Sequence, residues 1–197
     1  MSFGNQRLCI MQWRCLSACF SVVLILGLGL GNSATAKPRP WLHCDRLSFA
    51  LTPKSAHGND ITAFQNTNGV AIGCSRVFPR SASLDLLVGA SAMSFVNSYD
   101  VQSYALGLSV EYQYRFVPGG HLGAYAGLDV GLIYGYEGYL SPDWMIGPLT
   151  PAAEFSAGLL YEFPDRNLIL SGGVHIVPPT RDLSGVLSPT IGLSFKM

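Results

Sequence analysis

Between Tyr104 and Phe116 the chain reads YALGLSVEYQYRF, in which a large apolar or aromatic side chain occupies every second position. The intervening positions carry small, polar or charged residues, among them Glu111 and Arg115. Because successive side chains of a β-strand point to opposite faces, this alternation predicts a strand with one apolar face. The same period continues from Leu122 to Tyr136.

Six weaker segments with this period can be added, at residues 46–52, 69–78, 83–95, 150–163, 167–177 and 186–197. Short turns at 79–81, 117–120 and 164–166 alternate with longer loops at 53–68, 137–149 and 178–185. An even number of strands, with tight turns at one end and long loops at the other, is typical of outer-membrane barrels. We therefore predict an all-β fold, an eight-stranded antiparallel transmembrane β-barrel.

A secreted soluble barrel or sandwich is the alternative, because it also has alternating strands. In that fold the apolar residues point inward, and a narrow interior cannot hold all the large side chains of the strand at 104–116. The aromatic residues also gather at strand ends, as Tyr112 and Tyr114 at one end and Tyr134 and Tyr136 at the other. Aromatic girdles of this kind mark the two membrane interfaces, so the sequence favours the membrane barrel.

The composition and the N-terminus agree with an exported membrane protein. Only 12% of the 197 residues are charged, against about 25% in ordinary proteins, and the formal net charge of zero argues against nucleic-acid binding. Residues 1–36 have a basic lead, an apolar run at 16–31 and the small-residue site Ala34-Thr35-Ala36. We predict a signal peptide cleaved before Lys37, and a barrel of residues 37–197 in the outer membrane of a Gram-negative-type cell.

The polar parity of the strands predicts a charged lumen. Glu111, Arg115 and Asp129 are expected to form a structural ion-pair network there, and His175 to make a hydrogen bond inside the barrel. The four histidines have no metal-ligand spacing, so no metal and no cofactor is expected. Cys44 and Cys74 are the cysteines left after signal removal. They either form a disulfide, which the periplasm permits, or Cys74 is simply a small lipid-facing residue.

Several short motifs, in their shared order, resemble the lipid A palmitoyltransferase family of outer-membrane barrels. Residues 72–76 (IGCSR) are similar to the family's Gly-x-Ser-Arg strand, and 92–99 (AMSFVNSY) to its Ala-Met-Ala-Phe-Lys-Asp-Ser-aromatic stretch. Val110-Glu111 followed by Arg115 resembles its Trp-Glu and Arg. Prolines stand where the family opens lateral lipid gateways between strands, at Pro148, Pro151 and Pro178.

The resemblance implies catalytic positions that this chain fills only in part. Ser98 matches the family's serine, but Asn97 stands in place of its aspartate, and the first strand has no histidine. His57 is a substitute only if its loop folds back toward Ser98. An asparagine cannot act as a carboxylate base.

Two functions therefore stay open. One is a structural or binding barrel without chemistry; the other is an acyltransferase that moves a phospholipid acyl chain to lipid A or another glycolipid. In either case we expect a monomer whose partners are phospholipid, lipopolysaccharide and the barrel-assembly machinery.

Overall fold

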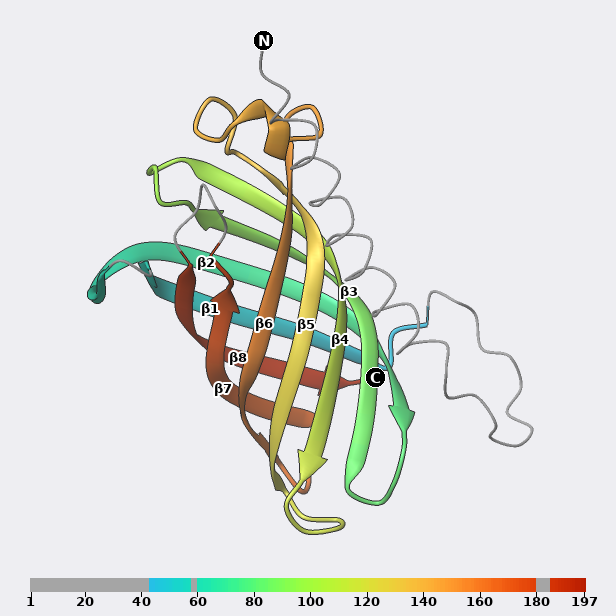
Figure 1. Ribbon diagram of the computed structural model, residues 1–197. Helices are drawn as coiled ribbons and strands as arrows, with labels where there is room; N and C mark the ends of the chain where they lie inside the picture. The colour runs from blue at the N-terminus through green and yellow to red at the C-terminus, as the bar shows by residue number, and fades with distance from the viewer. Residues whose placement is uncertain (1–42, 58–59, 180–184) are drawn as a thin grey trace. The chain divides into compact units, whose positions relative to one another are not determined.

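The computed structural model describes residues 43–57, 60–179 and 185–197, so the signal-peptide prediction lies outside the described residues. This part of the chain contains eight β-strands and one short 3-10 helix, η1 (Figure 1). In chain order they are β1 (Arg46–His57), β2 (Asp60–Pro79), β3 (Leu84–Val96), β4 (Gln102–Arg115), β5 (Leu122–Tyr134), η1 (Pro142–Trp144), β6 (Leu149–Glu162), β7 (Leu168–Val177) and β8 (Val186–Lys196). Within the described residues no helix is long and apolar enough to cross a membrane.

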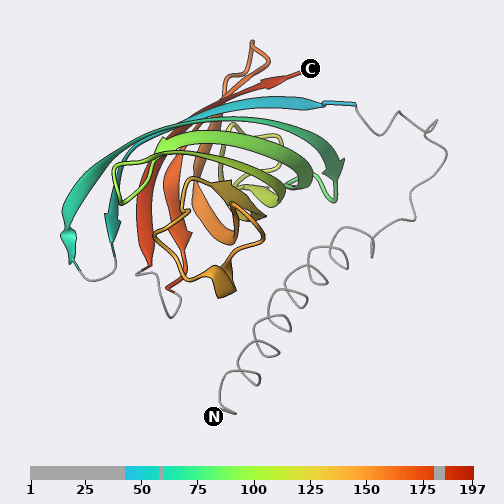
Figure 2. The same cartoon turned by 90° about the horizontal axis from the view of Figure 1, so that it is seen from above.

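The eight strands form one closed barrel in chain order, each antiparallel to its neighbours. Closure joins β1 to β8, from Arg46 opposite Lys196 to Leu51 opposite Ile191. Figure 2 shows the strands curving around a shared interior. The predicted fold class, an antiparallel barrel of eight strands, is confirmed.

The predicted long loop at 53–68 is wrong, because β1 and β2 continue through it as a hairpin. The ladder reaches His57 opposite Asp60, with an irregularity between Thr52 and Lys54 where Pro53 lies. Pro53 has no N–H to donate to a strand ladder, and Asn68 is a residue type common in turns, with a φ of 46° in the structure. These two residues are the local features that suggested a loop. Strand pairing beyond the barrel wall needs no apolar face, so hydrophobic periodicity does not reveal it.

The apolar parity of the strands points outward. On β4, Tyr104, Leu108 and Tyr114 are at least half exposed and Leu106 is 69% exposed, although Val110 of the same parity is buried. Every strand except β3 carries exposed large apolar side chains, including Phe49, Leu51, Val70, Ile72, Leu122, Leu132, Tyr134, Phe155, Leu159, Leu170, Ile176, Ile191, Leu193 and Phe195. The outside of the barrel is thus more apolar than its inside.

A small apolar core lies inside the barrel at the end with the short turns. It consists of the buried side chains of Tyr125, Leu160 and Ile169. The ring of Tyr125 lies over Gly158 and Gly173, which face each other on β6 and β7. A Cβ at either glycine would overlap the Tyr125 ring or neighbouring backbone, so these positions must be glycine for the ring to fit.

Candidate functional site

Asn97 holds the turn between β3 and β4 together and uses its whole amide to do so. Its Oδ1 accepts hydrogen bonds from the backbone N–H groups of Tyr99 (2.9 Å) and Val101 (3.1 Å). Its Nδ2 donates to the Ser103 hydroxyl (3.0 Å) and to the Gly135 carbonyl (2.9 Å), which ties this turn to the end of β5. Gly135 has a φ of 117° and packs against Ser103, so it accepts no side chain. The buried Asn97 is therefore placed as a structural residue.

Ser98 lies beside Asn97 but points to a different environment. Its residue is exposed, and its side chain hydrogen-bonds Tyr136. Burial raises the pKa of the Tyr136 phenol, while the hydrogen bond with Ser98 acts in the opposite direction. Tyr99 stacks on Tyr139 with ring centroids 4.4 Å apart and meets Tyr136 edge-on. The side chain that hydrogen-bonds Ser98 is thus a tyrosine phenol within an aromatic cluster.

His57 is the last residue of β1, where it lies opposite Asp60 on β2 and Val186 on β8. The β2–β3 register ends at Val70 opposite Ser94, so its continuation would bring Ser98 level with Asn66. His57 is farther along the hairpin by roughly six residues, or about 20 Å of strand. The structure therefore does not bring His57, Asn97 and Ser98 together as one site.

The three gateway prolines have different positions. Pro148 is exposed in the tight turn where Ile146 and Leu149 pair with each other. Pro151 lies within β6 opposite Leu132 of β5, and Pro178 directly follows β7. The β6–β7 ladder begins only at Phe155 opposite Ile176, so β6 runs for residues 149–154 without a partner on β7. Pro151 and Pro178 flank this interruption of the wall.

A second interruption, between β1 and β8, was not anticipated from the sequence. The register passes from Leu51–Ile191 directly to Ala56–Leu187. Pro53 and Pro189 lie in the gap, where neither can donate to the ladder. On the inner side the hydroxyls of Thr52 and Thr190 bridge the two strands at 3.0 Å. The signal available in the sequence was a proline in the first strand and another in the last strand, Pro53 and Pro189.

The expected lumen network is divided into separate groups. Arg115 does not pair with Glu111: its guanidinium donates to Asp85 (2.8 Å) and Glu162 (3.0 Å), and Glu162 also pairs with Lys196. Arg115 finds its partners on other strands, with Asp85 on the neighbouring β3 and Glu162 on β6. This four-residue cluster, Arg115 with Asp85, Glu162 and Lys196, occupies the short-turn end of the barrel, and we call it the plug.

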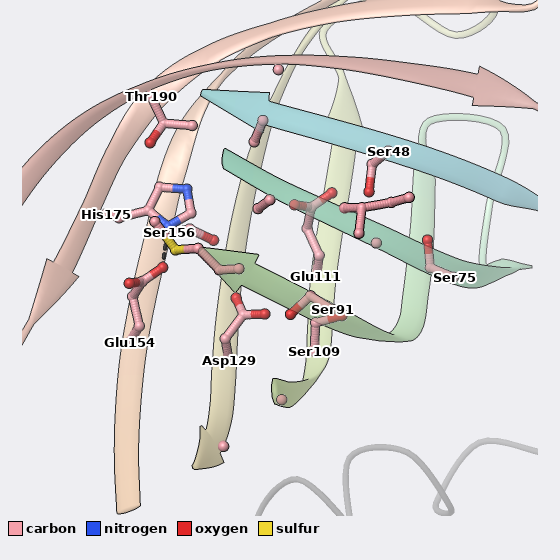
Figure 3. A pocket seen from close by; sticks show the side chains of 18 of the residues that line it. Ser48, Ser75, Ser91, Ser109, Glu111, Asp129, Glu154, Ser156, His175 and Thr190 are labelled. Atoms are coloured by element: carbon pink, nitrogen blue, oxygen red, sulfur yellow. Dashed lines mark hydrogen bonds and ion pairs between the residues drawn. The ribbon is translucent and has the colours of Figure 1, made fainter. Parts of the chain in front are cut away.

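The other two predicted lumen residues line a cavity of about 250 Å³. Glu111 accepts a hydrogen bond from Gln113 Nε2 (2.6 Å), and the other end of the Gln113 amide accepts one from Arg46. Asp129 lies directly opposite Glu154 in the β5–β6 ladder. Glu154 in turn pairs with His175 Nδ1, so the hydrogen bond expected of His175 is confirmed. Figure 3 shows the side chains of Glu111, Asp129, Glu154 and His175 around the cavity together with those of Ser91, Ser109 and Ser156.

A disulfide joins Cys44 and Cys74, whose Cα atoms are 5.5 Å apart. Cys74 is exposed and has the same outward parity as Val70 and Ile72, so the bridge lies on the outer side of the wall. It links the segment before β1 to β2 near the short-turn end. Both readings of Cys74 thus hold in part, because the residue faces outward and is bonded.

No family model and no curated protein sequence matches this chain. Among solved structures it is similar to the N-terminal β-barrel domain of Pseudomonas aeruginosa OprF, at 14% identity and a TM-score of 0.47, over 77% of this chain and 97% of that one. It is similar to the outer membrane enzyme PagL at 14% identity and a TM-score of 0.46, over 77% of this chain and 99% of that one. It is also similar to Neisserial surface protein A at 13% identity and a TM-score of 0.48, over 77% of this chain and 96% of that one. Likenesses at this level carry no conclusion about what this chain binds or does.

Proposed function

We propose that this chain is an outer-membrane β-barrel with a structural or binding role and no acyltransferase chemistry. The observation that carries the location is the inverted polarity of the barrel: large apolar side chains such as Leu106 and Leu108 are exposed outside, while ions and serines line the inside. Soluble proteins rarely expose apolar patches beyond a few hundred Å². A closed barrel also satisfies its backbone without water, as a bilayer requires.

The contacts of Asn97 support the absence of transferase chemistry. Its amide makes hydrogen bonds through both Oδ1 and Nδ2. A carboxylate at this position has no hydrogen to donate to Ser103 or Gly135. The asparagine therefore has a positive structural reason to be there, beyond the loss of an acid.

The acyltransferase alternative has less support. An acyl chain needs an apolar slot, whereas the cavity has the carboxylates of Glu111, Asp129 and Glu154 among its apolar lining residues. The candidate residues Ser98 and His57 also lie apart, in the turn after β3 and at the end of β1, and the partner of Ser98 is the Tyr136 phenol. What remains in its favour is the interrupted β6–β7 wall next to Pro151 and Pro178.

The membrane location is tested by a pair of neighbouring substitutions on β4. Leu108→Arg places a charge on the outward face and is expected to block assembly, at a midplane cost of about 2–4 kcal/mol. Ser109→Ala, on the lumen face, is expected to fold as the wild type does. The measurement is heat-modifiable migration of the barrel in outer-membrane fractions. Equal tolerance of both changes contradicts the proposal.

The chemistry is tested by mass spectrometry of lipid A from an outer-membrane-competent host that expresses the full chain. We expect the mass spectrum of lipid A to be the same with and without expression of the chain. An added acyl chain that disappears in Ser98→Ala restores the acyltransferase and overturns the non-enzymatic part of the proposal. The migration assay on the same fractions confirms that the barrel is folded in each case.

A further inference from the structure

We propose that Asn68-Gly69, on β2, is a site of spontaneous deamidation in the folded barrel. Among the asparagines of the chain, Asn68 is the one that a glycine follows. Deamidation begins when the backbone nitrogen of the following residue attacks the asparagine amide carbon, and a glycine has no side chain to hinder that approach. Three features of the structure carry the inference: a break in the strand ladders, the exposure of Asn68, and its backbone conformation.

Within the described strands, Asn68 has no ladder partner on either side. On the β1 side the register skips Asn68, which lies in the irregularity beside Pro53. Pro53 has no N–H with which to form a rung there. On the β3 side the ladder starts only at Val70 opposite Ser94. The backbone of Asn68 is therefore not fixed by pairing with either neighbouring strand.

The side chain of Asn68 is free to turn toward its own backbone. Asn68 is exposed, and its amide makes no hydrogen bond with any residue that the structure describes. Its φ of 46° lies in the left-handed region, which asparagine tolerates better than most residues. The preceding Thr67 is different, because it is buried and its hydroxyl donates to the Ser55 hydroxyl (2.7 Å). No comparable contact opposes rotation of the Asn68 amide within the described part of the chain.

A single rung holds Gly69, which supplies the attacking nitrogen. Gly69 pairs with Thr52 on β1, and it lies beyond the last rung of the β2–β3 ladder. The Gly69 amide has to leave this pairing before it attacks. The net contribution of one hydrogen bond corresponds to a factor of about ten or less in the equilibrium of such an opening. The fold therefore slows the reaction at Asn68 only modestly.

The reaction exchanges an amide for an acid and needs only water as a co-reactant. The backbone nitrogen of Gly69 forms a bond to Cγ of Asn68, and its proton leaves with the side-chain nitrogen as ammonia. Water then opens the cyclic succinimide. Cleavage of the bond between Cγ and the nitrogen gives aspartate, whereas cleavage of the bond between the main-chain carbonyl carbon and the nitrogen gives isoaspartate.

Both products change β2 at the place where the β1–β2 hairpin leaves the β3 ladder. Each product adds a carboxylate at position 68. Isoaspartate also adds a carbon atom to the main chain, between Thr67 and Gly69. Because strand pairing depends on a constant spacing along the backbone, the isoaspartate form disturbs the register of the hairpin.

The test is incubation of the full, folded chain in detergent micelles at mildly alkaline pH, followed by digestion and mass spectrometry of the peptide that contains Asn68. The same incubation in urea gives the rate for the unfolded chain. We expect Asn68 to convert in the folded barrel at a rate within about tenfold of the rate in urea. Asn97 is the internal control, and it is expected to remain an amide in the folded barrel because both ends of its amide are hydrogen-bonded.

Gly69→Ala is the matched variant, because a methyl group beside the attacking nitrogen hinders the approach. Gly69 has no positive φ that requires glycine, and the added methyl group meets the flexible end of the Met93 side chain. The variant is expected to lose most of the conversion at Asn68, both in the folded barrel and in urea. If the variant does not fold, its comparison with the wild type in urea still tests the part of Gly69.

A folded-state rate more than about tenfold below the rate in urea overturns the inference, because it means that the ladders protect Asn68. Equal conversion of Asn68 and Asn97 in the folded barrel also overturns it, as does a Gly69→Ala variant that converts as fast as the wild type. Migration of the heated and unheated barrel before and after incubation shows that the chain was folded while Asn68 reacted.

Discussion

The short-turn half and the loop-end half of the lumen use the same kinds of residue in different ways. At the short-turn end Arg115 lies between Asp85 and Glu162, and Lys196 completes the plug next to the buried Tyr125. Farther from the short turns, Asp129 lies opposite Glu154 on the neighbouring strand, and Glu154 pairs with His175. The first arrangement places each carboxylate in direct contact with a cation, whereas the second places two carboxylates opposite each other on neighbouring strands.

The two halves also differ in how continuously their strands are paired. Near the short turns the β6–β7 and β1–β8 ladders are regular, from Glu162–Ile169 and Arg46–Lys196 onward. Toward the loops both ladders are interrupted, with Pro151, Pro178, Pro53 and Pro189 at the gaps. Continuous strand pairing is thus concentrated in the short-turn half, and four substitution experiments test what the two halves contribute to stability.

The largest effect is expected from the plug. Arg115→Met leaves the buried Asp85 carboxylate without its cation and is expected to lower the free energy of unfolding by about 3 kcal/mol. Urea titration in micelles measures it, with Arg166→Met in an exposed turn as the matched control. Equal effects of the two changes would contradict the structural role of the plug.

The disulfide is expected to contribute next. Replacing Cys44 and Cys74 together by serine removes the bridge between the segment before β1 and β2, and is expected to cost about 3 kcal/mol or somewhat less. The unfolding midpoint with and without reductant reports the same difference in the wild type. Detection of two free thiols in unreduced protein would show that the bridge is not formed.

Asn97→Asp tests the turn that stands where the resemblance implies a catalytic acid. The loss of the Nδ2 donors to Ser103 and Gly135 is expected to cost about 1–3 kcal/mol, because the partners are left unsatisfied. Asn167→Asp, in an exposed turn, is the control and is expected to change little. A stabilised barrel that gains acyl transfer to lipid A would identify position 97 as catalytic instead.

The smallest effect is expected in the cavity, and with the opposite sign. Asp129→Asn removes the repulsion with Glu154 and is expected to raise the free energy of unfolding by about 0.2–1 kcal/mol in the absence of ligand. Asp143→Asn, in the exposed η1 helix, is the control. A clear destabilisation by Asp129→Asn would mean that its carboxylate supports the barrel, and the contrast between the two halves would fail.

The strand plan was predictable because it follows from local alternation. Tyr104, Leu106 and Leu108 share a parity that any extended backbone turns to one face, and the structure places them outside. The hairpin at 53–68 was missed for the complementary reason. Its pairing continues past Pro53 through contacts with a partner strand, and carries no apolar period.

The roles of individual site residues were much less predictable. In the sequence Asn97 is simply the wrong residue for a catalytic acid. Its structural role depends on Gly135, which is distant in the chain and is brought close only when β5 pairs with β4. His57 was a substitute for the missing histidine only if its loop folded back toward Ser98, and the β1–β2 ladder instead pairs it with Asp60.

The sequence by itself determined the number of strands and which parity faces outward, because both are properties of neighbouring residues along one backbone. Only the tertiary structure decided which charges meet. Glu111 and Arg115 are two pleats apart on β4, yet Arg115 pairs with Asp85 and Glu162 while Glu111 faces the cavity. The register and closure of the barrel bring those partners together, and no single strand contains that information.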